Sequence, residues 1–145
     1  MSPVGTTGEF PEMRQVVLDC TDARALAEFY RQLLGWRYRD GDEPESADQA
    51  GVAKDWLVLR SQTGAIGVAF QQVDHLHEST WPEPAIPQQL HLDMTVPTAE
   101  DLDAQHERVL SLGGRLLYDR SHDPQEPLRV YADPSGHPFC IFVTP

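Results

Sequence analysis

The chain contains two copies of one unit, and each copy reads as a strand, a helix and then further strands. The first copy opens with Val16–Cys20 and the second with Leu90–Met94. Near the ends of the copies, the turn glycines Gly64 and Gly136 lie 72 residues apart. Repeated units of this kind bury a shared core, and a ligand fits at the seam between them. The duplication therefore limits the fold to one built from two similar halves.

Hydrophobic periodicity and turn residues divide each copy into elements. In the first copy, Thr21 or Asp22 is a candidate N-cap for a helix that stops at Gly35. In the second copy, Thr98 is the candidate cap for a helix over Ala99–Leu112. Strands are predicted over residues 13–20, 36–39, 55–60, 66–73, 90–96, 115–118, 128–132 and 138–143.

Each copy is thus a βαβββ module, and the chain is predicted to be α+β, with two such modules forming curved mixed sheets around a central cup. We assign residues 1–12 to a disordered tail, 13–73 to the first module, 74–89 to a proline-containing linker and 90–145 to the second module. The acidic, polar stretch at residues 40–53 is predicted to be a loop, and the sequence leaves open whether it closes over the cup.

Composition narrows the class of partner. With 145 residues and 40% apolar content, the chain is long enough for one domain with a core. A net charge of −12 argues against nucleic acids and anionic membranes as partners. We find neither a signal peptide nor an apolar run of the roughly 20 residues that span a bilayer. The two cysteines lie in strand-like segments, which favours buried thiols in the reducing cytoplasm.

Three segments resemble a known family: Thr80–Pro82, Leu90–Met94 and Asp133–Phe139. Together with the βαβββ duplication, they resemble the vicinal oxygen chelate superfamily and, within it, the glyoxalase-like branch. That superfamily includes glyoxalase I, extradiol dioxygenases, fosfomycin-resistance enzymes and bleomycin-binding proteins. The resemblance covers about residues 13–143. It implies a cup-shaped fold that binds small molecules, and a homodimer.

The resemblance also implies where a metal ion is held in the metal-using members, at the opening and closing strands of the copies. The opening positions fall on Gln15 and His91, and the closing positions on Val68 and Cys140. Valine cannot bind a metal, and a cysteine thiolate suits zinc better than the harder ions of oxygen-chelating chemistry. We therefore expect no metal cofactor. If an ion is bound, its ligands would be Gln15, His91 and Cys140.

Strand alternation places polar side chains inside the cup. Gln15, Val17 and Asp19 share one face of the first opening strand, and His91 and Asp93 share one face of the second. Buried polar groups need partners, so these residues either contact a ligand or bond one another in a structural network. The sequence leaves both alternatives open.

Aromatic and basic residues supply further candidates. Trp56, Trp81 and Phe70 could line the cup, although all three could equally be core. One of the strand-borne residues Arg60, Arg115 and Arg129 could hold an anionic group, and alternation does not settle which. The run His75–Glu78 could place two imidazoles and a carboxylate near one ion, but a solvent-exposed position explains these polar residues better.

The sequence therefore predicts a metal-independent binder of a small organic molecule, with a role in drug or metabolite sequestration. The alternatives are a metal-dependent lyase, isomerase or dioxygenase of the same superfamily, and an interaction module with a vestigial cup. The identity of the ligand stays open. The residues predicted to contact it are Gln15, Asp19, Trp56, Trp81, His91 and Asp93.

Overall fold

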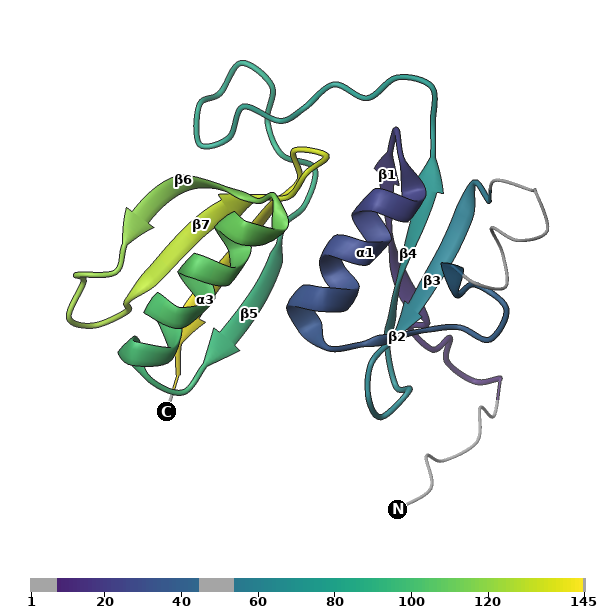
Figure 1. Ribbon diagram of the computed structural model, residues 1–145, viewed down its shortest axis with the longest axis horizontal. Helices are drawn as coiled ribbons and strands as arrows, with labels where there is room; N and C mark the ends of the chain where they lie inside the picture. Colours follow the sequence, from purple (N-terminus) through teal and green to yellow (C-terminus); the bar gives the residue numbers. More distant parts are fainter. Residues whose placement is uncertain (1–7, 45–53, 145) are drawn as a thin grey trace.

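The computed structural model describes residues 8–44 and 54–144 (Figure 1). Of the expected tail at residues 1–12, residues 1–7 lie outside these ranges, and residues 8–12 form neither helix nor strand. Residues 45–53 of the expected loop at residues 40–53 also lie outside them. The described chain forms two four-stranded mixed sheets, each with a long helix against one face. This arrangement confirms the α+β prediction, and the sheets are not closed into barrels.

The two sheets have the same topology. The first has the order β1-β4-β3-β2 and the second the order β5-β8-β7-β6. In each, the opening strand pairs in parallel with the closing strand, and the other neighbours are antiparallel. The strands are β1 (Gln15–Cys20), β2 (Arg37–Tyr38), β3 (Trp56–Arg60), β4 (Gly67–Gln72), β5 (Leu92–Val96), β6 (Arg115–Arg120), β7 (Leu128–Ala132) and β8 (Pro138–Val143).

The helices begin and end where the local chemistry requires. Helix α1 (Ala23–Leu34) is capped by Asp22, whose carboxylate accepts a hydrogen bond from the backbone of Ala25 at 3.0 Å. It stops at Gly35, which has the left-handed φ of 69° that glycine adopts without strain. Helix α3 (Ala99–Leu112) is capped in the same way by Thr98. Of the two caps considered for the first helix, Asp22 is therefore the one used.

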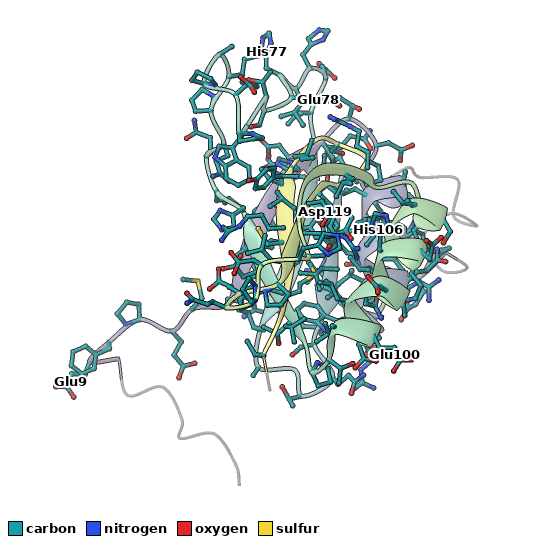
Figure 2. The ribbon with its side chains drawn as sticks, turned by 90° about the vertical axis from the view of Figure 1, so that its left-hand side faces the viewer. Glu9, His77, Glu78, Glu100, His106 and Asp119 are labelled. Atoms are coloured by element: carbon teal, nitrogen blue, oxygen red, sulfur yellow. The ribbon has the colours of Figure 1, made fainter. Side chains whose placement is uncertain are left out.

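Each sheet has one face under a helix and one face turned away from it. In β1, Leu18 and Cys20 are fully buried in the core, whereas Val17 and Asp19 are exposed on the other side. Figure 2 shows the helix that carries His106 and Glu100 on one side of the sheets. The opposite side is called here the open face. No helix within residues 8–44 and 54–144 covers the open faces, and side chains such as Asp19 and Tyr118 are exposed there.

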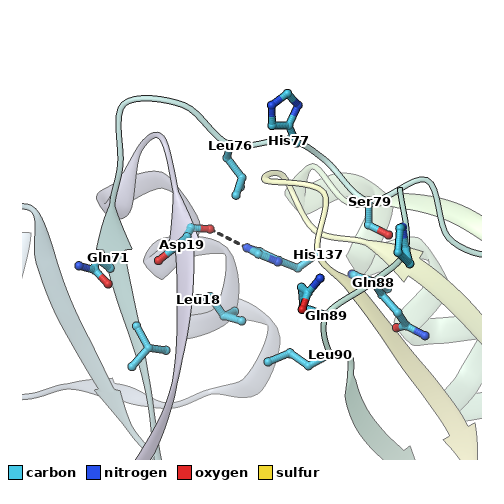
Figure 3. Close-up of a pocket in the computed structure, with 13 residues that line it drawn as sticks. Leu18, Asp19, Gln71, Leu76, His77, Ser79, Gln88, Gln89, Leu90 and His137 are labelled. Carbon is cyan, nitrogen blue, oxygen red and sulfur yellow. Dashed lines mark hydrogen bonds between the residues drawn. The ribbon is translucent and has the colours of Figure 1, made fainter. Parts of the chain in front are cut away.

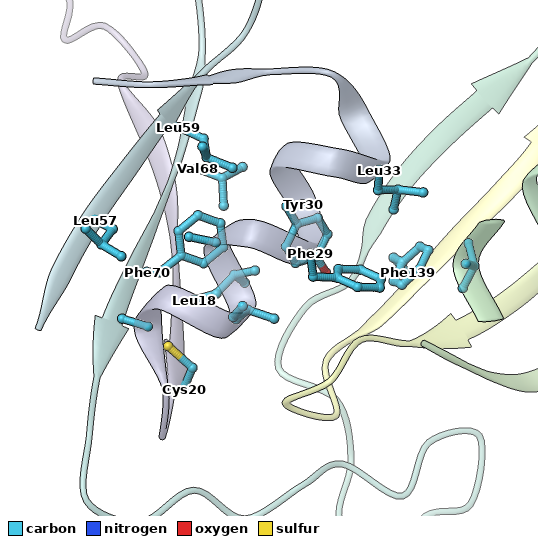
Figure 4. Packing of buried hydrophobic residues seen from close by; sticks show 14 of the residues in the cluster. Leu18, Cys20, Phe29, Tyr30, Leu33, Leu57, Leu59, Val68, Phe70 and Phe139 are labelled. Carbon is cyan, nitrogen blue, oxygen red and sulfur yellow. The ribbon is translucent and has the colours of Figure 1, made fainter. Parts of the chain in front are cut away.

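Helix α1 joins the two modules, because it packs against both sheets. Its Phe29 and Tyr30 rings lie 5.9 and 6.1 Å from the ring of Phe139 on β8 (Figure 4). The Tyr30 hydroxyl donates to the Asp133 carboxylate of the second module at 2.6 Å. Burial raises the pKa of Asp133, and the Tyr30 hydrogen bond opposes that shift. The modules thus share one core.

The strand register corrects one position of the sequence analysis. Val68 was expected at a closing position of the cup, yet it pairs with Val16 and is buried under α1. Its neighbour Ala69, which pairs with Val17, occupies the open face instead. In the second module Cys140 does lie on the open face, opposite Asp93. The offset from the turn glycine thus differs by one residue between modules, and a one-residue shift reverses the face.

None of the helices within residues 8–44 and 54–144 is long and apolar enough to cross a membrane.

Candidate functional site

A pocket of about 380 Å³ lies on the open face of the second sheet, and we call it the second-sheet pocket. Leu128, Val130 and Cys140 come from the two central strands of the sheet and form its floor. Tyr118 and Arg120 from β6 lie on the same face, because they pair with Val130 and Leu128. The linker between the modules supplies Trp81 and Pro82, and His91 immediately precedes β5.

Trp81 is positioned by a closed loop in the linker. The Thr80 backbone N–H donates to the carbonyl of Ile86 at 2.8 Å, and the Ile86 N–H donates back to the Thr80 hydroxyl at 2.9 Å. The backbone N–H of Trp81 donates to the Ser79 hydroxyl at 3.0 Å. These bonds fix residues 79–86 as a compact loop, so the indole is carried onto the sheet without belonging to a strand.

His91 is held from three sides. Its ring stacks on Trp81, with a centroid separation of 6.0 Å and an angle of 7° between the ring planes. Its Nδ1 lies 3.1 Å from Oε1 of Gln88, and its Nε2 lies 3.3 Å from Oδ1 of Asp93. The Asp93 carboxylate is an acceptor and the Gln88 carboxamide offers both an acceptor and a donor, so a neutral imidazole with its N–H on Nε2 pairs with both neighbours.

Cys140 completes the polar cluster. Its Sγ, one His91 nitrogen and one Asp93 oxygen all lie within 4.8 Å of one another. Burial raises the pKa of the Cys140 thiol to about 11, and the negative charge of Asp93 adds to the shift. The thiol is therefore protonated near neutral pH and behaves as a small apolar group with a weak donor.

The cluster can be tested for its fit to a metal ion. One imidazole, one carboxylate and one thiol form a nitrogen, oxygen and sulfur donor set, which suits zinc. The bond between His91 Nδ1 and Gln88 has the form of an outer-shell contact that orients a ligating histidine. The three residues therefore fit a borderline-soft ion such as zinc, and sulfur makes the set a poor match for hard ions.

A second pocket, of about 330 Å³, lies at the seam between the modules, and we call it the seam pocket (Figure 3). Asp19 and Gln71 line it from the first sheet, and Gln88 and Leu90 line it from the segment before β5. His137 bridges the modules here, because its Nε2 lies 2.6 Å from the backbone oxygen of Asp19. The segment before β5 thus borders both pockets, since Gln88 contacts His91.

The structure brings together three of the six predicted contact residues: Trp81, His91 and Asp93. Asp19 lines the adjacent seam pocket instead. Gln15 and Trp56 lie on the first sheet, in β1 and β3. The side-chain oxygen of Gln15 is buried, and no group in the described part of the chain hydrogen-bonds to it.

Sequence reasoning missed Tyr118, Arg120 and Gln88. Alternation along β6 could have indicated which face Tyr118 and Arg120 occupy. A register shift between Leu116 and Tyr118 interrupts this alternation. Gln88 belongs to the irregular linker, where no periodicity applies.

The other sequence candidates have local partners. Phe70 is fully buried in the core under α1. Arg115 pairs with Glu78 at 3.3 Å, and the buried Arg129 pairs with Asp103 at 3.0 Å on the helix side. These pairs explain Arg115 and Arg129 as structural residues, and the pairing of Glu78 fits the surface interpretation of His75–Glu78.

Comparison with known proteins identifies the family and the fold of the chain. The family model for the glyoxalase-like domain matches residues 15–142. A hypothetical protein from Staphylococcus aureus, SA1046, superposes with a TM-score of 0.65 at 18% identity, covering 94% of this chain and 100% of the other. No curated protein sequence matches the chain.

Two further solved structures carry informative names. A glyoxalase/bleomycin resistance protein/dioxygenase family enzyme from Burkholderia phytofirmans has a TM-score of 0.64 at 16% identity, covering 92% of this chain and 98% of its own. The fosfomycin resistance protein FosX from Listeria monocytogenes, complexed with Mn(II) and sulfate, has a TM-score of 0.64 at 15% identity, covering 94% of each chain. At these identities the likeness shows the fold alone, and the family model carries the assignment: this chain belongs to the glyoxalase-like family of the vicinal oxygen chelate superfamily.

Proposed function

We propose that this protein binds a small organic molecule in the second-sheet pocket without requiring a metal ion, and that it thereby sequesters a drug or metabolite. The observation that carries the proposal is the Trp81–His91 stack, because both stacked residues line a pocket of about 380 Å³. Concave sites of this size with apolar walls and few polar groups are typical of small-molecule binding.

The lining indicates the chemistry of the ligand. Trp81 and Tyr118 offer flat aromatic surfaces, and Leu128 and Val130 offer aliphatic ones. A ligand with a planar, largely apolar body would bury its faces against these groups. At the polar end, His91 and its partner Asp93 would pair with a hydrogen-bonding group. Sequestration needs no more than this, because tight binding alone lowers the free concentration of a toxic compound.

The proposal predicts a ligand-dependent rise in thermal stability that depends on the stacked pair. A panel of planar metabolites and antibiotics is screened for compounds that raise the Tm of the protein, since any ligand of the folded state does so. His91→Ala and Trp81→Leu are each expected to weaken the affinity for such a compound about tenfold or more, because aromatic anchors dominate small interfaces.

The matched control is His122→Ala, which removes an exposed loop imidazole that does not line the pocket. Calorimetric titration of the four proteins gives the affinities. Equal affinities for the two pocket variants and the control would contradict the proposed location of the ligand.

A second candidate function is metal-dependent catalysis, and the mutual proximity of His91, Asp93 and Cys140 favours it. These three residues would hold the ion, which when bound would act as a Lewis acid on substrate oxygens. FosX, one of the solved structures of similar fold, was crystallised with Mn(II). The cluster differs from a site for such a hard ion because one of its three groups is a thiol, and burial raises the pKa of that thiol.

Metal analysis separates the two candidates. Our first proposal predicts less than about one tenth of an equivalent of zinc or manganese per chain after dialysis. Close to one equivalent of zinc in the wild type, lost in His91→Ala but retained in His122→Ala, would establish the metal-dependent alternative instead.

Two further parts of the proposal concern the setting of the protein. We propose a homodimer, as the family resemblance implies. Exposed apolar side chains support it, namely Val17, Leu90, Leu116 and Tyr118. We also propose a cytoplasmic location, which the two free, buried cysteines support.

A further inference from the structure

Two arginines face each other directly across the first sheet. The register of β2 and β3 pairs Arg37 with Arg60, at the end of the sheet where β3 stops (Figure 1). Residues opposite each other on antiparallel strands point to the same face, with Cβ atoms about 5 Å apart. Like charges in this position destabilise a sheet unless a negative charge lies between or beside them.

The described part of the chain supplies no such charge. Among residues 8–44 and 54–144, no carboxylate oxygen lies within the 4.0 Å ion-pair distance of Arg37 or Arg60. Arg37 makes one long hydrogen bond, 3.5 Å from its Nη2 to the carbonyl of Gln62. The neighbouring Arg39 does have a carboxylate partner, Asp42, at 3.1 Å. In a chain with 23 acidic and 11 basic residues, this missing partner is informative.

The space beside these guanidinium groups is open. Arg37, Arg39 and Arg60 line a pocket of about 480 Å³ together with the turn that follows β3. Asp40 also lines this pocket, although it forms no ion pair with any arginine of the described chain. Arg60 extends over Gly67, where an added Cβ would come within 3.3 Å of Nη1 and 2.8 Å of the Leu59 carbonyl. The glycine thus leaves room for the arginine.

The turn adds hydroxyl groups that can donate. Ser61 Oγ and Thr63 Oγ1 lie 3.4 Å apart, and each accepts a hydrogen bond from a backbone N–H further along the turn. Two hydroxyls carry two hydrogens, and their mutual bond uses one. The other hydrogen is available to an acceptor in the pocket, which both hydroxyls line.

We propose that Arg37 and Arg60, assisted by a hydroxyl of Ser61 or Thr63, bind an oxyanion, namely the carboxylate or phosphoryl group of a small molecule. A guanidinium presents paired N–H groups that match the oxygens of either group. An anion bound beside both guanidinium groups attracts each of them, and these two attractions offset the repulsion between the cations. This site goes beyond the proposed function, because it lies on the other sheet and does not depend on ligand binding at Trp81.

The test compares anions at constant ionic strength, because the net charge of −12 opposes anions and salt screens the arginines. Inorganic phosphate and succinate each replace chloride in separate series, and Tm is recorded for wild type, Arg37→Gln, Arg60→Gln and Arg115→Gln. Arg115→Gln is the matched control, since it removes one positive charge from an exposed ion pair on the second sheet.

We expect phosphate, succinate or both to raise the wild-type Tm by about 4 °C or more at concentrations far above Kd. Both site variants should lose most of this rise, and the control should keep it. In chloride alone the site variants should be at least as stable as wild type, because removing one cation relieves the repulsion. A response to phosphate alone or to succinate alone assigns the phosphoryl or the carboxylate class.

Three results would overturn the proposal. One is no rise with either anion in the wild type, and another is an equal rise in all four proteins. The third is a loss of stability in chloride for both site variants while their anion response is retained, which would make the arginines structural.

Discussion

Replacing Phe139 with alanine is expected to lower the free energy of unfolding by about 3–5 kcal/mol, the cost of emptying a large aromatic site in a packed core. The Phe139 side chain is fully buried, and its ring contacts Phe29 and Tyr30 of the first module and Tyr131 of the second. The change therefore weakens the junction of the two modules as well as one sheet. Urea denaturation followed by circular dichroism measures the loss.

Phe10→Ala is the matched control, because it removes the same side chain where 72% of it is exposed. Its effect should stay within about 0.5 kcal/mol. A loss below about 1 kcal/mol for Phe139→Ala would show that α1 does not join the modules as described.

Replacing Asp42 with alanine is expected to cost about 2–3 kcal/mol. This carboxylate is 1% exposed and holds the chain that leads into β3. It accepts hydrogen bonds from Lys54 at 2.8 Å, from the backbone of Val58 at 3.0 Å and from Arg39 at 3.1 Å. Without it, the Val58 N–H loses its acceptor inside the protein. The exposed neighbour Asp40, replaced by alanine, should change stability by less than about 0.5 kcal/mol.

The same residue predicts a pH dependence. Burial would raise the pKa of Asp42, but the hydrogen bonds from Lys54, Val58 and Arg39 outweigh it and leave the pKa below its ordinary value of 3.8. A lowered pKa in the folded state stabilises the protein above the unfolded pKa, and this contribution is lost as the pH falls through the folded pKa. The stability advantage of wild type over Asp42→Asn should therefore shrink between about pH 5 and pH 2. A constant difference over this range would contradict the depressed pKa.

The elements of the fold could be predicted because their signals are local. Asp22, Gly35 and Thr98 determine helix ends through contacts within a few residues, so the sequence pattern indicates them directly. Alternation in β1 likewise identified the buried face that carries Leu18 and Cys20. The duplication then implied two sheets of equal topology, and the strand pairings confirm this.

The candidate site was predicted in part, since some of its contacts depend on loop paths and register. The stacking of Trp81 on His91 follows from a linker loop closed by the Thr80 hydroxyl, and no periodicity encodes such a path. The error at Val68 came from counting residues from a turn whose length differs between the modules. The side-chain directions of the strand-borne arginines also depend on strand register, so the sequence did not determine which of them faces a pocket. In the structure, the pairing of Arg60 with Arg37 places Arg60 beside an open pocket.

A crystal structure of the protein with a compound that raises its Tm tests most directly whether the second-sheet pocket is the binding site. We predict density for the compound against the rings of Trp81 and Tyr118, with a polar group within hydrogen-bond distance of His91 or Asp93. Density for the compound elsewhere on the molecule, with the Trp81–His91 stack unchanged and the pocket filled by water, would contradict this assignment.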